Sequence, residues 1–292
     1  MSSKSPWKPL AWNGIRLEVP ADWDPARIGR RFLFLEDADG PALALRWEPI
    51  AGRFDPEKTL QNLSRAVGTD AQLRSEAPPP LWKKAVTSGK RPSPEVSGFR
   101  WQDGAGLLLY WSGIPIAALA GFYGDPPPAA GPVLAAIRPV FDRPTLPYFL
   151  YDLHARVPAD LNLDRFRFVP GAFELAFSGG GTRLRLYRWG PASMLVGADG
   201  LAAFARQRIP SVPANAAEDG ETLQWETGLG GPLGKLIPGK RPRFEAGRVW
   251  RLPGPDRLLG VVAAGPTKEA ARTLRDRTAA DCHIADLTET GR

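Results

Sequence analysis

Two short stretches decide the fold of this chain: Val19-Pro20-Ala21-Asp22 near the start and Val157-Pro158-Ala159-Asp160 just past the midpoint. Downstream of each copy, a Gly-containing turn leads into an alternating run that ends in Arg46-Trp47 in the first half and in Arg188-Trp189 in the second. A length of 292 residues also suits two domains. We infer two diverged copies of one domain, covering residues 1–143 and 144–292.

The same order of elements is predicted in both halves, from apolar alternation, helix caps and turn residues. In the first half we expect a strand at 15–19, a hairpin of 32–35 with 43–47, a helix that Asp55 caps and Gly68 ends, strands at 96–102, 107–111 and 116–122, and a helix at 133–140. In the second half we expect a strand at 153–157, a hairpin of 173–177 with 184–189, a helix that Asp199 caps, strands near 223–226, 248–252 and 258–264, and a helix from 267 to about 278.

The fold class that follows is α+β: two tandem similar domains, each an antiparallel β-sheet packed by short α-helices. Residues 142–147 contain two prolines, so we expect a short linker there. The register of the later strands is open. Strand count pairs Trp101 with Trp225 and Trp111 with Trp250, whereas a second register pairs Trp82 with Trp225 and Trp101 with Trp250. We prefer the first, and in either one the recurring tryptophans are expected to be core residues.

Composition narrows the choice of function. The single Cys282 excludes an internal disulfide, and two histidines, His154 and His283, offer little for a metal site. The start of the chain lacks the apolar stretch of a signal peptide, and no later run is long enough to span a bilayer, so a cytoplasmic protein is expected. The net charge of +7 favours an anionic partner through long-range attraction.

The opening strand and the element order resemble a known family. Gly14-Ile15-Arg16-Leu17-Glu18-Val19-Pro20-Ala21-Asp22-Trp23 is similar to the start of domains in the Mog1/PsbP-like group, which includes DcrB-like proteins. The second copy departs from this pattern, because Leu161 stands where the tryptophan is expected. The resemblance implies an antiparallel sheet covered by helices and a binding role without chemistry. It assigns no functional residues.

Catalytic motifs are weak in this chain. Cys282-His283 is the one neighbouring pair with nucleophile and base chemistry, but adjacent strand residues point to opposite faces, and His154 lies in an alternating strand. Ser178-Gly179-Gly180-Gly181-Thr182 joins two strands instead of opening a helix, so it predicts a hairpin turn and no phosphate loop. Residues 228–236 lack the hydroxyl of a Walker motif, and Asp37-Ala38-Asp39-Gly40 has its glycine too early for a calcium loop. We therefore expect no enzyme, no cofactor and no metal.

Each half carries a basic segment rich in proline and glycine. The candidate partner-binding residues in these two loops are Lys83, Lys84, Lys90, Arg91, Lys235, Lys240, Arg241 and Arg243. Cationic side chains on such loops can engage an acidic protein face or phosphates, and they can also be solvated charges with no partner.

The function that this sequence favours is a non-enzymatic protein-binding adaptor or accessory subunit of a cytoplasmic complex, with a protein partner that is acidic. One alternative is a nucleic-acid-binding protein that uses the two Gly-Lys-Arg-Pro loops, and its affinity would be sensitive to salt. Another is a small-ligand carrier or enzyme with a cleft between its domains.

Overall fold

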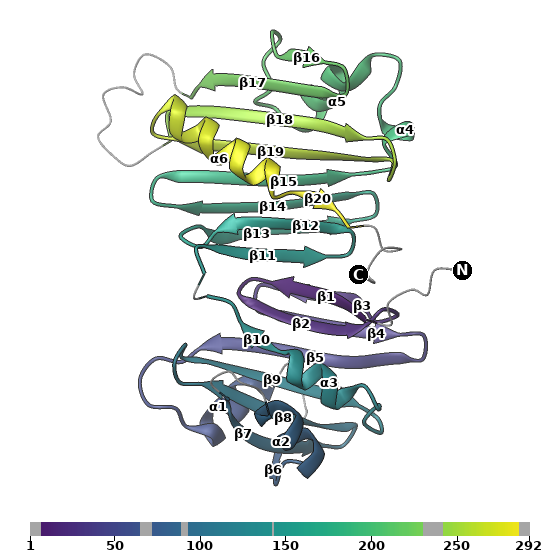
Figure 1. Ribbon diagram of the computed structural model, residues 1–292, viewed down its shortest axis with the longest axis vertical. Helices are drawn as coiled ribbons and strands as arrows, with labels where there is room; N and C mark the ends of the chain where they lie inside the picture. Colours follow the sequence, from purple (N-terminus) through teal and green to yellow (C-terminus); the bar gives the residue numbers. More distant parts are fainter. Residues whose placement is uncertain (1–6, 65–71, 89–92, 142, 230–241, 286–292) are drawn as a thin grey trace. The chain divides into compact units, whose positions relative to one another are not determined.

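The computed structural model describes residues 7–64, 72–88, 93–141, 143–229 and 242–285. Two compact units divide this chain between Tyr151 and Asp152: unit 1 takes in the residues up to Tyr151, and unit 2 runs from Asp152 to Asp286 (Figure 1). Residues 145–150 form a strand that pairs with the first strand of unit 1. The expected linker at 142–147 is therefore wrong for its second half.

Unit 1 begins with two short strands, continues with a hairpin and a helix, and ends with further strands and helices. Its elements are β1 (Trp7–Trp12), β2 (Ile15–Pro20), β3 (Asp24–Gly29), β4 (Phe32–Asp37), β5 (Gly40–Pro49), α1 (Pro56–Leu63), β6 (Arg74–Glu76), α2 (Pro80–Thr87), β7 (Glu95–Trp101), β8 (Gly104–Trp111), β9 (Ile116–Tyr123), α3 (Ala130–Ala136), β10 (Arg138–Pro139) and β11 (Thr145–Leu150).

Unit 2 repeats most of this order. Its elements are β12 (Leu153–Pro158), β13 (Asn162–Val169), β14 (Ala172–Gly179), β15 (Thr182–Trp189), α4 (Ala192–Leu195), α5 (Gly200–Arg208), β16 (Ala217–Asp219), β17 (Thr222–Gly228), β18 (Phe244–Leu252), β19 (Arg257–Gly265), α6 (Lys268–Ala280) and β20 (His283–Ile284).

Each unit has a seven-stranded sheet with the same connectivity. The strand order is β3-β4-β5-β9-β8-β7-β6 in unit 1 and β13-β14-β15-β19-β18-β17-β16 in unit 2, with antiparallel neighbours. A helix follows the third strand and another follows the last strand in both. The α+β class with antiparallel sheets is thus confirmed. By strand order, β7, which contains Trp101, corresponds to β17, which contains Trp225, as strand count predicts.

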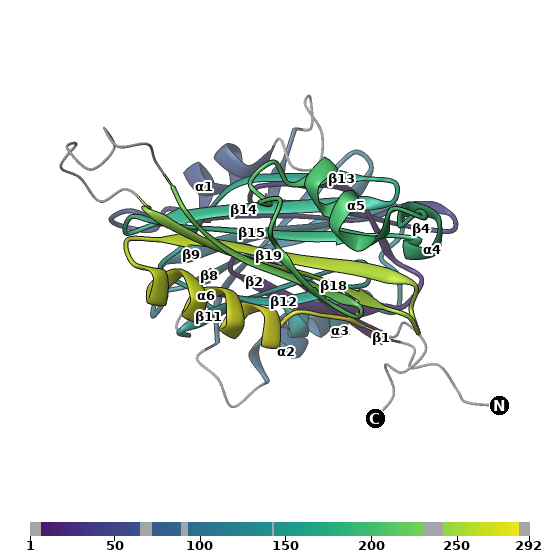
Figure 2. The ribbon, with the colours of Figure 1, turned by 90° about the horizontal axis from the view of Figure 1, so that it is seen from above.

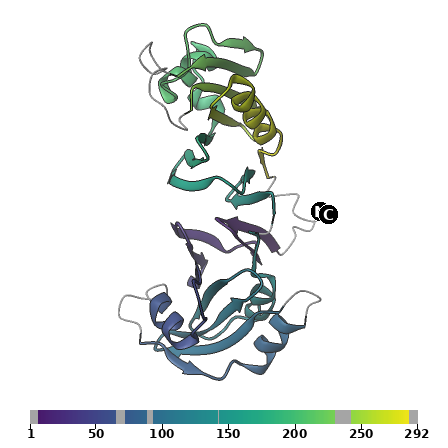
Figure 3. The same cartoon turned by 90° about the vertical axis from the view of Figure 1, so that its left-hand side faces the viewer.

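Helices cover both faces of each sheet. In unit 1, α1 lies on one side of the sheet and α2 and α3 lie on the other (Figures 2 and 3). In unit 2, α5 and α6 lie on opposite sides of β14, β15, β18 and β19 (Figure 2). Nine of the ten tryptophans are buried, which confirms their predicted core role.

Several elements were not predicted from the sequence. The edge strands β3 and β13 each carry charged residues and a bulge, so they lack clean alternation. The three-residue strands β6 and β16 are exposed throughout. The helix expected at 133–140 covers Ala130–Ala136 instead, because Pro139 cannot continue it and residues 138–139 pair with β2.

The cap of α1 is as predicted, and that of α5 is not. Asp55 accepts a hydrogen bond from the N–H of Lys58 at 3.0 Å, with Pro56 at the first helical position. Asp199 occupies the cap position of α5, but its side chain makes no capping hydrogen bond. The predicted stop of the first helix, Gly68, lies outside the described residues; the described helix ends at Leu63.

The two Arg-Trp pairs are not structural equivalents. Trp189 belongs to the cluster under α5, where its ring meets Phe204 edge-on with centroids 5.4 Å apart. In β5 it is Ala44 that belongs to the cluster under α1, so Trp47, three residues away, faces the other side of its sheet. A one-residue difference in register between the two units accounts for this, because a shift of one residue exchanges the two faces of a strand.

Candidate functional site

Three of the eight predicted basic residues lie in the described part of the chain, two in unit 1 and one in unit 2. Lys83 and Lys84 are exposed on helix α2 and not on a loop, because Pro80 stands at the first helical position, where proline favours a helix. Arg243 is exposed beside β18, and its backbone N–H donates to the carbonyl oxygen of Gly265 at 2.8 Å. The other five, Lys90, Arg91, Lys235, Lys240 and Arg241, lie outside the described residues.

A different basic surface is present on unit 2. Arg165 and Arg167 alternate along β13, and Arg183 and Arg185 alternate along β15. The register aligns Arg165, Ala176 and Arg185 across β13, β14 and β15, so all four arginines share one face of the sheet. We name these four residues the arginine face.

The arginine face lies on the α5 side of the sheet, beyond the area that the helix covers. Tyr187 continues the row of Arg183 and Arg185 along β15 and is buried in the cluster under α5. Burial raises the pKa of Tyr187, and the nearby Arg185 guanidinium opposes that rise. Thus one strand passes from a covered apolar segment to an exposed cationic one.

The charges of the arginine face are only partly neutralised. Glu174 on β14 accepts a hydrogen bond from Arg165 Nη2 at 2.6 Å, and the Arg165 side chain remains 66% exposed. Arg167 and Arg183 are exposed, and no described carboxylate forms an ion pair with either of them. Exposed, unpaired guanidinium groups present rigid donor forks that match carboxylates and phosphates.

The corresponding face of unit 1 is more apolar. On the α1 side, Phe34 of β4 and Ala44 of β5 are buried core residues, and the guanidinium of Arg27 lies 3.9 Å from the centre of the Phe34 ring. The alternating Arg-x-Arg patterns at 165–167 and 183–185 were visible in the sequence and could have indicated the arginine face.

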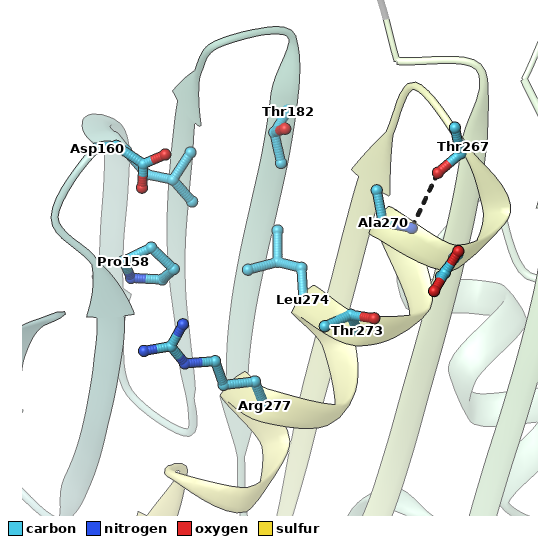
Figure 4. A pocket seen from close by; sticks show the side chains of 10 residues that line it. Pro158, Asp160, Thr182, Thr267, Ala270, Thr273, Leu274 and Arg277 are labelled. Atoms are coloured by element: carbon cyan, nitrogen blue, oxygen red, sulfur yellow. Dashed lines mark hydrogen bonds between the residues drawn. The ribbon is translucent and has the colours of Figure 1, made fainter. Parts of the chain in front are cut away.

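A groove lies on the opposite, α6 side of unit 2, with a volume of about 530 Å³. Its walls are the β12–β13 turn with Asp160 and Leu161, Thr182 at the start of β15, and the side of α6 that carries Glu269, Leu274 and Arg277. Leu274 points from α6 toward the strands, and Arg277 reaches toward Pro158, while Asp160 lies at the other end (Figure 4).

The candidate chemical groups do not form a catalytic set among the described residues. Cys282 is buried, and burial raises the pKa of its thiol to about 12, so the thiolate nucleophile is suppressed. His283 in β20 pairs with His154 in β12, their ring centroids 5.5 Å apart. In the described part of the chain, no group of three His, Cys, Asp or Glu residues is placed to hold a metal ion.

The glycine-containing segments are turns where they are described. Ser178 to Thr182 is a hairpin between β14 and β15, as predicted. In the 37–40 turn, Asp37 Oδ1 accepts hydrogen bonds from the backbone N–H groups of Asp39 and Gly40, at 2.8 and 3.1 Å. These hydrogen bonds stabilise the turn. None of the described helices has both the length and the apolar character needed to span a bilayer.

Comparisons with known proteins identify no family. No family model matches the chain, and no curated protein matches it. Among solved structures, it is similar to the immunity protein TplEi of the T6SS from Pseudomonas aeruginosa, solved in complex with an "L" peptide. The identity is 10%, the match covers 97% of this chain and 99% of that chain, and the TM-score is 0.27. Because this TM-score is low, no property of that protein is transferred to this chain.

Proposed function

We propose that this protein is a non-enzymatic adaptor or accessory subunit, and that unit 2 binds an acidic surface of a partner protein through the arginine face. The observation that carries the proposal is the position of Arg183 and Arg185. Charged residues on an edge strand such as β13 do not by themselves indicate a binding surface, because preventing association with the edge of another sheet is a sufficient explanation for them. However, β15 is an interior strand, so edge protection does not account for its two arginines.

An acidic protein suits this surface better than a nucleic acid. Tyr187, the aromatic residue of this row, is buried and so offers no platform for stacking a base. Nucleic-acid binding and protein binding are distinguished by their sensitivity to nuclease.

Two further expectations belong to the same proposal. We propose that each unit is a Mog1/PsbP-like repeat, supported by the shared order of strands and helices in the two units. We also propose the cytoplasm as its compartment, because the lone Cys282 suits a reducing environment.

The test compares charge-reversed proteins. Arg167→Glu with Arg183→Glu alters two exposed side chains that have no described ion-pair partner, so the fold should be unaffected. A matched control, Arg74→Glu with Arg156→Glu, makes the same change of net charge at exposed positions on β6 and β12. Each tagged protein is purified from native lysate at moderate salt, with and without nuclease, and the bound molecules are identified and quantified.

The proposal expects a stoichiometric, nuclease-resistant protein that wild type and the control retain and the arginine-face variant loses. Two reversed contacts should weaken binding at least about tenfold, since each exposed ion pair contributes up to about 1 kcal/mol and reversal adds repulsion. Equal recovery by both variants would contradict the role of this face. Recovery of nucleic acid that nuclease removes would transfer the role to phosphate binding.

A further inference from the structure

The groove beside α6 borders a turn at which unit 2 has a smaller side chain than unit 1. In unit 1 the N–H of Trp23 donates to the carbonyl oxygen of Pro20 at 3.1 Å, and in unit 2 the N–H of Leu161 donates to that of Pro158 at 3.2 Å. The two turns follow strands with the same alternation of burial, Ile15–Pro20 and Leu153–Pro158. Trp23 and Leu161 are therefore equivalent positions.

Aromatic rings close this region in unit 1. Trp23 is buried, with its ring 6.4 Å from that of Phe122, and Trp82 of α2 packs on the same Phe122 at 5.3 Å. Unit 2 has no helix between β16 and β17, which are joined by a tight turn with Asp219 paired to Thr222. With leucine at 161 and no counterpart of α2, the apolar surface of Leu161 and Leu274 borders an open groove.

The charges at the groove are asymmetric. Asp160 and Glu269 are exposed carboxylates on its walls, and neither forms an ion pair with a described residue. Arg277 lies at the end away from Asp160 (Figure 4). A ligand with a cation near Asp160 gains attraction there and avoids repulsion from Arg277.

We propose that this groove binds a segment of a partner protein that inserts one aromatic side chain against Leu161 and Leu274 and places a lysine or arginine beside Asp160. The aromatic ring supplies the apolar volume that tryptophan supplies in unit 1, and a ring carries the largest apolar contribution that a single side chain can make. The site lies on the α6 side of the sheet and does not depend on the arginine face.

The test uses three short probes whose binding is followed by NMR. Acetyl-Trp-Lys-amide carries the ring and the cation, acetyl-Trp-Glu-amide reverses the charge, and acetyl-Ala-Lys-amide removes the ring. We expect Trp-Lys to give saturable shifts at the backbone amides of Thr182, Thr273 and Leu274. Replacing its lysine by glutamate should weaken binding by roughly two- to fivefold, the range of an exposed ion pair, and removing the ring should weaken it more.

Protein variants locate the site. Leu161→Trp fills the groove from within and should abolish the shifts, and Thr273→Trp, at an exposed position of α6, should block it from outside without loading the core. Asp160→Asn should remove the preference for lysine over glutamate. Arg167→Glu with Arg183→Glu should leave probe binding unchanged, so the groove and the arginine face succeed or fail separately.

Three results would overturn the proposal: no saturable shift at the groove with the Trp-Lys probe, undiminished binding by folded Leu161→Trp or Thr273→Trp protein, or equal affinity for the Trp-Lys and Trp-Glu probes. Binding of the probes at other residues alone would count in the same way.

Discussion

Trp23 and Leu161 occupy the same position of the same turn, one in each unit. Their N–H groups donate to the carbonyl oxygens of Pro20 and Pro158 at 3.1 and 3.2 Å, and both side chains are directed into buried surroundings. The two units therefore show the same backbone position with two different side chains. What differs at this position is the size of the side chain and the aromatic packing around it.

Exchanging these two residues should therefore have opposite effects on stability. Leu161→Trp should raise the free energy of unfolding by about 0.5–2 kcal/mol, as cavity-filling substitutions do. Trp23→Leu should lower it by about 1–3 kcal/mol, because it leaves a void beside Phe122. Urea denaturation followed by circular dichroism measures both, and a loss of stability in both variants would show that the turns are not equivalent in packing.

A close contact in the core of unit 2 depends on a glycine. A Cβ atom at Gly247 of β18 would lie 2.0 Å from the ring of Trp225 on the neighbouring strand. Gly247→Ala should cost about 1–3 kcal/mol through overpacking. Gly254→Ala is the matched control, since nothing lies within 4 Å of its added carbon. Equal urea midpoints for the two variants would contradict this close packing of Gly247 against Trp225.

Asp152 joins two arginines in unit 2. Its Oδ2 accepts hydrogen bonds from Arg188 Nη2 and from Arg257 Nε, the latter at 3.1 Å. The side chains of Asp152 and Arg188 are only 10% and 9% exposed. Asp152→Ala leaves a buried guanidinium without its carboxylate, and we expect a loss of about 3–5 kcal/mol.

Adding Arg188→Met to Asp152→Ala should recover much of that loss, because the uncompensated charge is then removed. Denaturation of the single and double variants gives the coupling directly. A double variant no more stable than the single one would show that Arg188 is not the source of the cost.

The ion pairs of α6 make stability depend on pH in acid. Arg272 donates two hydrogen bonds to Glu226 of β17, at 2.7 and 2.9 Å, and lowers the pKa of that carboxyl. A lowered folded-state pKa contributes stability above the pKa of the unfolded chain, near 4.3, which is lost as the pH falls through the folded value.

Glu226→Gln should therefore reduce stability at pH 7 by less than about 1 kcal/mol, as for exposed pairs. The gap between the variant and wild type should shrink as the pH drops below about 4. Glu218→Gln, on the exposed strand β16, is the matched control for the loss of one carboxylate. Urea midpoints measured across this pH range test the prediction. A stability difference between Glu226→Gln and wild type that stays constant with pH would contradict it.

The sequence predicted the interior of this fold better than its edges. Strands such as 116–122 and 258–264 read clearly because both of their faces are buried, which leaves continuous apolar runs. The edge strand β13 was missed because its arginines and its bulge between Leu163 and Arg165 interrupt the alternation. Those same arginines form half of the arginine face.

Most of the candidate site could not be predicted from the sequence. Clusters of Lys and Arg in Pro/Gly-rich segments drew attention, yet five of those eight residues lie outside the described part and Lys83 and Lys84 lie on a helix. The two Arg-x-Arg patterns are visible in the sequence, but placing all four arginines on one face requires the register of three strands, which aligns Arg165 with Arg185 through Ala176. For the groove, the indication in the sequence was Leu161, at the position where the first half has Trp23.

The most direct test of the proposed function is site-specific photocrosslinking inside cells. A benzoyl-phenylalanine at position 176, between Arg165 and Arg185, is compared with the same residue at exposed position 74 on β6. The proposal predicts a discrete protein adduct from position 176 that nuclease leaves intact and that Arg167→Glu with Arg183→Glu removes. An adduct that persists in this variant, or no adduct from position 176 that position 74 does not also give, would contradict it.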